Sequence, residues 1–279
     1  MADISAAFVT QYEAEVHVAY QQGGSMLRNS VRVKTGVVGA NTKFTRIGKG
    51  QATQKPRKGN VVPMDVDHSQ VDCPISDWYA PDYVDKLDEY KVNYDERRVL
   101  TQAGAYAVGR KVDELIIKAA TDAVTAGNTV GTGAAVLSLA NVLEAFALFN
   151  ETEVPDDGQR YAVVGPRQWN SLLQIDQFAK SDYIGNEYPW LKGREAKRWL
   201  NIVWMMHNGL TKTPDVTPTA TKCLLYHKTA LGLAENGSGI TAEINYVPEK
   251  VSYLCNNMIA CGTVAIDPTG IVCLHVKDK

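Results

Sequence analysis

The sequence predicts an α+β fold, in which one long helix packs against strands drawn from distant parts of the chain. Three observations support this prediction. Residues 94–126 carry apolar side chains at helical spacing, residues 28–86 alternate short β-prone pieces with glycine, lysine and threonine, and residues 240–279 are rich in strand-forming segments. A sheet with one apolar face and a helix with one apolar stripe can cover each other, which favours a layered unit.

Residues 28–86 are predicted to form a long two-stranded ribbon with a mobile tip near residues 48–60. Such a ribbon has no core of its own. Ordering its backbone costs about 1–2 kcal/mol per residue, and an isolated two-stranded hairpin is marginally stable in water. We therefore expect the ribbon to lie on another surface, and a second copy of the chain can supply it.

The segment 94–126 is predicted to be one amphipathic helix much longer than average. A compact α/β region follows, with a helix opened by Ser138, a buried strand in RYAVVG (160–165) and a helix that starts at Pro166. LNIVWMM (200–206) is a further strand candidate. The C-terminal strands turn at DPTG and are expected to pack against the long helix.

The charges are segregated along a chain whose formal net charge is only −2. From Val16 to Met64 there is no carboxylate, but there are nine basic residues: Arg28, Arg32, Lys34, Lys43, Arg46, Lys49, Lys55, Arg57 and Lys58. The following segment has ten acids against two lysines, a net charge of −8. The acids are Asp65, Asp67, Asp72, Asp77, Asp82, Asp85, Asp88 and Glu89, then Asp95 and Glu96. We interpret these blocks as functional features, because chance is a weak explanation for such a pattern.

The basic segment has three possible roles. It can dock onto an acidic protein surface, grip nucleic acid through salt-dependent phosphate contacts, or form an ordinary solvated loop. Within its most basic stretch, residues 41–60, only Phe44 and Ile47 interleave with the charges, which is poor provision for base stacking, and no helix carries the charge into a groove. Docking onto protein is the favoured interpretation.

Known catalytic and cofactor motifs are not found. GVVGANTK and GKGQAT lack the full phosphate-loop spacing, and GNTVGTG lacks the flanking strand and helix of a dinucleotide site. The five histidines are scattered, and Asp156 with Asp157 are better explained as a solvated turn than as an acid/base pair. We expect no catalytic, cofactor-binding or metal-binding residues.

The five cysteines do not have metal-site spacing and are interpreted as buried thiols. No stretch is long and apolar enough to span a membrane, and the N-terminus carries acids where a signal peptide would carry lysines. These features predict a soluble intracellular protein with no membrane partner.

The order and spacing of the parts resemble the HK97-like major capsid proteins of tailed phages. The segments that carry this resemblance are ERRVLTQAGAYAVGRKVDELI, RYAVVGPRQWNSLL, QIDQFAKSDYIG, KGREAKRWLNIVWMMHN and TVAIDPTGIVCLHV. The resemblance implies an N-terminal arm (1–27), an extended loop (28–86), a peripheral domain with the spine helix (87–136), an axial domain (137–245) and peripheral return strands (246–279).

The resemblance also implies a function. Copies would form hexamers and pentamers that close into an icosahedral shell around double-stranded DNA, assembled in the host cytoplasm and carried in the virion. The extended loop of one subunit would lie across its neighbour, so that the basic loop meets the acidic segment. A portal, a separate scaffolding protein and a possible cement protein would be partners, DNA would be contacted non-specifically at most, and no covalent crosslink is expected.

Two alternatives remain at this stage. An encapsulin-type compartment has the same fold and encloses protein cargo. A small α/β hydrolase or transferase would instead place its site near EVPDDGQR and RYAVVG.

Overall fold

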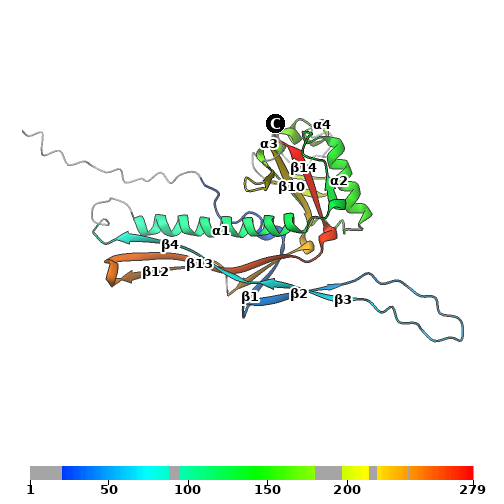
Figure 1. Cartoon of the computed structure of the whole chain (residues 1–279), viewed down its shortest axis with the longest axis horizontal. Helices are drawn as coiled ribbons and strands as arrows, with labels where there is room; N and C mark the ends of the chain where they lie inside the picture. Colours follow the sequence, from blue (N-terminus) through cyan, green and yellow to red (C-terminus); the bar gives the residue numbers. More distant parts are fainter. Residues whose placement is uncertain (1–20, 88–94, 180–196, 214–218, 238, 279) are drawn as a thin grey trace, which may run out of the picture.

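The computed structural model describes residues 21–87, 95–179, 197–213, 219–237 and 239–278. It has an elongated layer of helix and sheet, a compact α/β part on one side of this layer, and a ribbon that projects from it (Figure 1). Of the predicted N-terminal arm (1–27), the structure describes only residues 21–27. None of the described helices is long and apolar enough to cross a membrane.

The elongated layer is built on a five-stranded sheet organised around β13. Its strands are β1 (Arg32–Val37), β4 (Ser76–Asp85), β11 (Leu231–Asn236), β12 (Thr241–Val247) and β13 (Ser252–Ala265). β13 pairs antiparallel with β4, β11 and β12, and β1 joins β11 in parallel. Every second residue of β13 from Cys255 to Cys261 is buried, because alternate side chains of a strand point to opposite faces.

The spine helix α1 (Glu96–Ala123) lies along one face of this sheet (Figure 1). Asp95 caps its N-terminus, and the Asp95 carboxylate accepts a hydrogen bond from the Arg98 amide at 3.2 Å. Its buried side chains recur at helical spacing, which confirms the predicted amphipathic helix. They include Val108, Val112, Ile116, Ile117 and Ala120. The helix ends at Ala123, before the predicted end at residue 126, because Val124 already has extended dihedrals.

The compact part contains a seven-stranded sheet with three helices. Its strands are β5 (Thr129–Val130), β6 (Arg160–Val164), β7 (Lys197–Trp199), β8 (Ile202–Met206), β9 (Lys212–Thr213), β10 (Ala220–His227) and β14 (Ile271–Lys277). Its helices are α2 (Leu139–Glu151), α3 (Pro166–Leu173) and α4 (Asp176–Ala179). β10 pairs antiparallel with β6 and β14, and β6 pairs in parallel with β8. The strands predicted over 160–165 and 200–206 and the helices predicted at Ser138 and Pro166 are present.

Aromatic side chains fill the core of the compact part. Phe178 packs edge-to-face against Trp199, with ring centroids 5.3 Å apart, and also against Trp169 and Trp204. Each large apolar side chain that is fully buried contributes about 1.5–3 kcal/mol to folding. This cluster therefore anchors α3 and α4 to the sheet.

The projecting ribbon consists of β2 (Asn41–Ile47) and β3 (His68–Pro74), which pair with each other and with no other strand in the described part of the chain. It is shorter than the ribbon predicted over 28–86, because β1 and β4 pair with β11 and β13 instead. Strand pairing also crosses the boundary between the predicted axial domain and the predicted peripheral return strands. β11 and β12 come from 137–245 but join β13, whereas β14 comes from 246–279 but joins β10.

Short 3-10 turns complete the chain. They are η2 (Arg28–Ser30), η4 (Ala126–Asn128), η6 (Lys228–Ala230), η7 (Pro248–Lys250) and η8 (Pro268–Gly270).

Candidate functional site

Among the described residues, those of the ribbon project furthest from the rest of the fold (Figure 1). β2 and β3 stay in register from Asn41 opposite Pro74 to Ile47 opposite His68. One further backbone hydrogen bond joins the Gly48 amide to the Asp67 carbonyl at 2.8 Å. Beyond it, residues 49–66 contain no strand and are nearly all exposed. We call this segment the ribbon tip.

The base of the ribbon is held by a small apolar cluster. Its buried members are Val37, Phe44, Cys73, Ala234 and Ile266. Two glycines permit the close contacts: a Cβ on Gly232 would lie 2.9 Å from the Phe44 ring, and one on Gly262 would lie 1.9 Å from the Pro74 carbonyl oxygen. The ribbon is therefore fixed at its base.

The basic residues nearest the body have partners within the same chain. Arg28 makes two hydrogen bonds to the buried carboxylate of Glu235, at 2.7 and 2.8 Å. Arg32 and Lys34 lie over the Phe44 ring, 5.8 and 6.0 Å from its centroid. These residues strengthen the base of the ribbon and are poorly placed to act as its contact surface.

Three further basic residues along the ribbon form ion pairs within the chain. Lys43 pairs with Asp72 on the opposite strand at 3.7 Å. Arg46 reaches Asp267 at 3.2 Å, beside η8. Lys49 pairs with Glu153, just after α2, and this hydrogen bond and charge lower the pKa of Glu153. The pairs to Asp267 and Glu153 connect one flank of the ribbon to the body.

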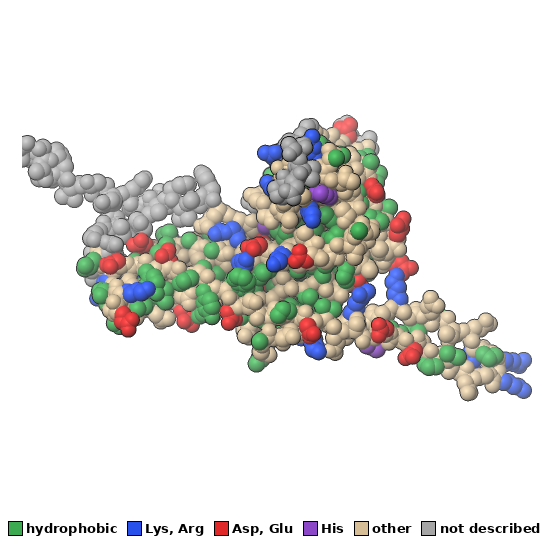
Figure 2. Space-filling model, in the orientation of Figure 1, with side chains coloured by type: hydrophobic (Ala, Val, Ile, Leu, Met, Phe, Trp, Pro, Cys, Tyr) green, Lys and Arg blue, Asp and Glu red, His purple; other side chains and the backbone are tan. Residues whose placement is uncertain are grey.

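The last three basic residues, Lys55, Arg57 and Lys58, lie on the ribbon tip. They are exposed, and they form no ion pair with another described residue. Figure 2 shows basic side chains at the far end of the projecting segment. The positive charge that is free to meet a partner is thus concentrated at the tip.

The predicted acidic segment does not form one surface. Asp65 and Asp67 lie on the returning side of the ribbon, and Asp72 is already paired with Lys43. The acids on β4 are spread along that strand: Asp77, Asp82 and Asp85. Asp88 and Glu89 lie outside the described residues. Of the two acids that follow, Asp95 caps α1 and Glu96 is its first residue.

A buried carboxylate on α1 was not singled out by the sequence. Asp113 is fully buried and accepts hydrogen bonds from Gln22, Ser25, His207 and the amides of Met26 and Leu27, at 2.6–3.1 Å. Burial opposes its ionisation, but the bonds from His207, Met26, Ser25 and Leu27 outweigh it and lower the pKa of Asp113. The available sequence signal was an acid placed between Val112 and Ile116 on the apolar stripe.

The other candidate chemical groups have structural roles. All five cysteines are buried and unpaired, as predicted, and burial raises the pKa of Cys223 and Cys261 to about 12. Asp157 accepts the Gln159 amide and pairs with the buried His227 at 3.1 Å. No group of three metal-ligating side chains occurs among the residues whose positions are described.

A profile of the family described as phage capsid protein matches residues 4–277, nearly the whole chain. The chain belongs to the phage capsid protein family. As a member of this family it is a major capsid protein, a structural protein that forms the shell of the virion. The compartment and small-enzyme alternatives are not favoured.

Solved capsid structures share the fold of this capsid protein. The capsid of the cyanophage P-SCSP1u matches with a TM-score of 0.73 and 16% identity, over 100% of this chain and 96% of the other. The capsid of Ralstonia phage GP4 matches with a TM-score of 0.73 and 13% identity, over 100% and 97% of the two chains. The structure of Mycobacterium phage Che8 matches with a TM-score of 0.72 and 18% identity, over 96% of this chain and 97% of the other. The HK97-like fold is thereby confirmed. A comparison with curated protein sequences finds no match.

Proposed function

We propose that the capsid protein assembles head to tail, with the ribbon tip of one copy lying across the outer end of the next copy's sheet. The observation that carries this proposal is the direction of the ribbon. The tip points away from the end of the layer where β4, β12 and the start of α1 lie (Figure 1). β4 itself runs away from the ribbon base for ten residues, about 33 Å. A tip cannot reach this end of its own molecule.

A contact between two different surfaces generates rings when the rotation closes. In this proposal the rings are hexamers and pentamers, which close into an icosahedral shell around double-stranded DNA. Residues 1–27 act as an arm, 28–86 as the extended loop, 87–136 and 246–279 as the peripheral domain, and 137–245 as the axial domain.

The charges specify the register of the contact. Lys55, Arg57 and Lys58 on the tip face Asp82 and Asp85 at the outer end of a neighbour's β4. Each exposed ion pair contributes only about 0–1 kcal/mol to the binding free energy. Such pairs can align two copies and still let a misplaced copy dissociate. The apolar tip residues Val61, Val62 and Met64, which are 72%, 58% and 54% exposed, supply surface that burial can stabilise.

Further roles complete the proposal. A portal and a separate scaffolding protein act with the shell, which assembles in the host cytoplasm and can add a cement protein. The protein has no catalytic activity, forms no covalent crosslink and meets packaged DNA through non-specific contacts only.

A charge reversal at the tip tests the proposal. The variant Lys55→Glu, Arg57→Glu, Lys58→Glu should fold normally by circular dichroism and give no shells in negative-stain micrographs. Adding Asp82→Lys and Asp85→Lys in the same chain should restore shells, because every copy then carries both reversed surfaces. Lys118→Glu, at an exposed position on α1, is a charge-reversal control away from the proposed contact and should still give normal shells. Normal shells from the triple variant would refute the proposed contact.

A further inference from the structure

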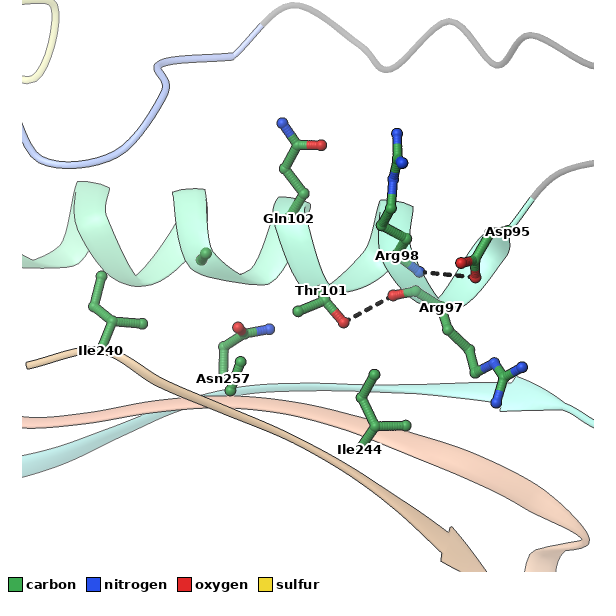
Figure 3. A pocket seen from close by; sticks show the side chains of 10 residues that line it. Asp95, Arg97, Arg98, Thr101, Gln102, Ile240, Ile244 and Asn257 are labelled. Atoms are coloured by element: carbon green, nitrogen blue, oxygen red, sulfur yellow. Dashed lines mark hydrogen bonds between the residues drawn. The ribbon is translucent and has the colours of Figure 1, made fainter.

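The turn that connects β11 to β12 begins with an asparagine followed by a glycine. Asn236 is the last residue of β11, and residues 237–240 lead to β12. Asn236 and Gly237 are both exposed. The residues on either side are held in place, because Glu235 is buried and Ile240 faces α1 (Figure 3). The turn is therefore fixed at its two ends and open at the Asn236–Gly237 peptide bond.

The backbone nitrogen of Gly237 is free of contacts with the described residues. Gly237 has a φ of +63°, and a Cβ at this position would meet nothing within 4 Å. Its carbonyl oxygen accepts a hydrogen bond from the Gly36 amide at 3.2 Å, but its own N–H has no acceptor in the described part of the chain. The Asn236 side chain also makes no hydrogen bond to a described residue. No described contact therefore keeps the Gly237 nitrogen away from the Asn236 carboxamide.

A second Asn–Gly pair, Asn208 with Gly209, has different surroundings. The Gly209 amide donates to the His207 Nδ1 atom at 2.9 Å, and a Cβ on Gly209 would lie 2.9 Å from the His207 ring. His207 is itself bonded to the buried Asp113. The nitrogen of Gly209 is thus engaged in a packed region, so the chain contains its own control for an exposed pair.

We propose that Asn236 is a site of spontaneous deamidation through a cyclic imide, and that Asn208 is protected from the same reaction. The Gly237 nitrogen gives its proton to base and attacks the Asn236 Cγ atom. The new N–C bond closes a succinimide ring, the Cγ–Nδ2 bond breaks, and ammonia leaves. Water then opens the ring at either carbonyl, which gives aspartate or isoaspartate. Glycine favours the attack because it has no Cβ and because its backbone reaches many conformations.

The isoaspartate product acts on the base of the ribbon. Asn236 pairs with Val37 at the end of β1, and the Gly36–Gly237 hydrogen bond lies beside this pair. An isoaspartyl linkage routes the main chain through the side chain and so lengthens the backbone. The Gly237 carbonyl is then displaced from the Gly36 amide, and the end of β1 loses support at the point where the chain leaves the sheet for the ribbon. The inference concerns the separate subunit and does not depend on the proposed head-to-tail contact.

Peptide mapping by mass spectrometry of the full-length, unassembled subunit tests the inference. During incubation in mildly alkaline buffer, we expect Asn236 to convert to aspartate and isoaspartate at least ten-fold faster than Asn208. In urea-unfolded protein the two rates should become similar, because the local structure that protects Asn208 is then lost. A folded subunit in which Asn236 is not the faster site, or a difference that persists in urea, would overturn the inference.

A glutamine variant separates this reaction from other ageing of the protein. Asn236→Gln keeps a primary amide but would have to close a larger, disfavoured ring, so we expect no conversion at position 236. Amide hydrogen exchange in residues 32–37 should become faster in incubated wild type and remain unchanged in incubated Asn236→Gln. Unchanged exchange in the wild type, or an equal increase in the glutamine variant, would contradict the effect on the ribbon base.

Discussion

At the scale of single residues, Asp113 joins three parts of the chain. It sits on α1, accepts hydrogen bonds from Gln22 to Leu27 at the N-terminal end of the described chain, and receives another from His207 after β8. The His207 Nδ1 atom accepts the Gly209 amide at 2.9 Å, so a neutral ring donates from Nε2 to Asp113. One carboxylate thus positions the N-terminal segment, the spine helix and the compact part.

Replacing this carboxylate should strongly destabilise the subunit. Asp113→Asn keeps the shape but puts an amide NH2 against existing donors, and we expect a loss of about 2–4 kcal/mol in the free energy of unfolding, measured by urea denaturation. Asp122→Asn, an exposed position on the same helix, should change it by less than about 0.5 kcal/mol. Equal stabilities for the two variants would contradict the role given to Asp113.

The lowered pKa of Asp113 predicts a pH dependence. The unfolded chain has an aspartate pKa of about 3.9, so it takes up the proton at a higher pH than the folded chain does. The stabilisation is fully present above about pH 5 and is lost as the pH falls through the depressed folded value. Between pH 6 and pH 3, the stability difference between wild type and Asp113→Asn should shrink. A constant difference over that range would exclude ionisation as the cause.

At the scale of elements, the spine helix depends on glycine where other chain segments cross it. A Cβ on Gly109 would lie 2.7 Å from the backbone of Gly24 and Ser25. Backbone atoms cannot move aside as a flexible side chain can. The absence of a side chain therefore lets residues 24–25 reach Asp113, one turn further along the helix.

Gly109→Ala tests this packing, because helix propensity and packing predict opposite changes in the free energy of unfolding. Alanine is favoured over glycine in a helix interior by about 1 kcal/mol, whereas overpacking costs about 1–3 kcal/mol. We expect a net loss of stability and faster amide hydrogen exchange in residues 21–27. Gly127→Ala, where a Cβ would meet nothing within 4 Å, should not produce either effect. A stabilised Gly109→Ala protein would show that residues 24–25 can move away at little cost.

Local sequence patterns predicted the positions of helices and strands better than they predicted which strands and side chains pair. The spacing of Val108, Val112 and Ile116 identified α1, because helix periodicity is local. The parallel pairing of β1 with β11 joins residues about 200 positions apart, so no local signal could show that β1 leaves the ribbon. The nine basic residues were visible as a block, but Glu235, Asp267 and Glu153, the partners of Arg28, Arg46 and Lys49, are distant in sequence.

At the scale of the whole molecule, exposed basic residues lie at one end of the molecule and exposed acidic residues at the other. The ribbon tip carries Lys55, Arg57 and Lys58, and the far end of the layer carries Asp82 and Asp85. In the proposed assembly each copy contributes one of these surfaces to each of two neighbours. In this proposal the ion pairs set the register of the contact, and the burial of apolar surface supplies most of its stability.

Assembly should therefore weaken with salt at its early stage. The Debye length falls from about 10 Å at 0.1 M to about 3 Å at 1 M, which screens exposed pairs. We expect the initial rate of shell formation, followed by light scattering, to fall several-fold between 0.1 and 0.5 M NaCl. The rate of the Lys55→Glu, Arg57→Glu, Lys58→Glu variant carrying Asp82→Lys and Asp85→Lys should respond in the same way. A rate that is independent of salt would argue that charge does not guide the encounter.

The continuity of β3 and β4 has a mechanical consequence. Only Ile75 separates the two strands, so the ribbon runs directly into a strand that stays in register with β13 from Ser76 opposite Cys261 to Asp85 opposite Ser252. A force on the tip acts along β4. It loads the hydrogen bonds between β4 and β13 in shear, so that many of these bonds share the force. Tension passed from one copy to the next would in this way be borne by the central strand of each.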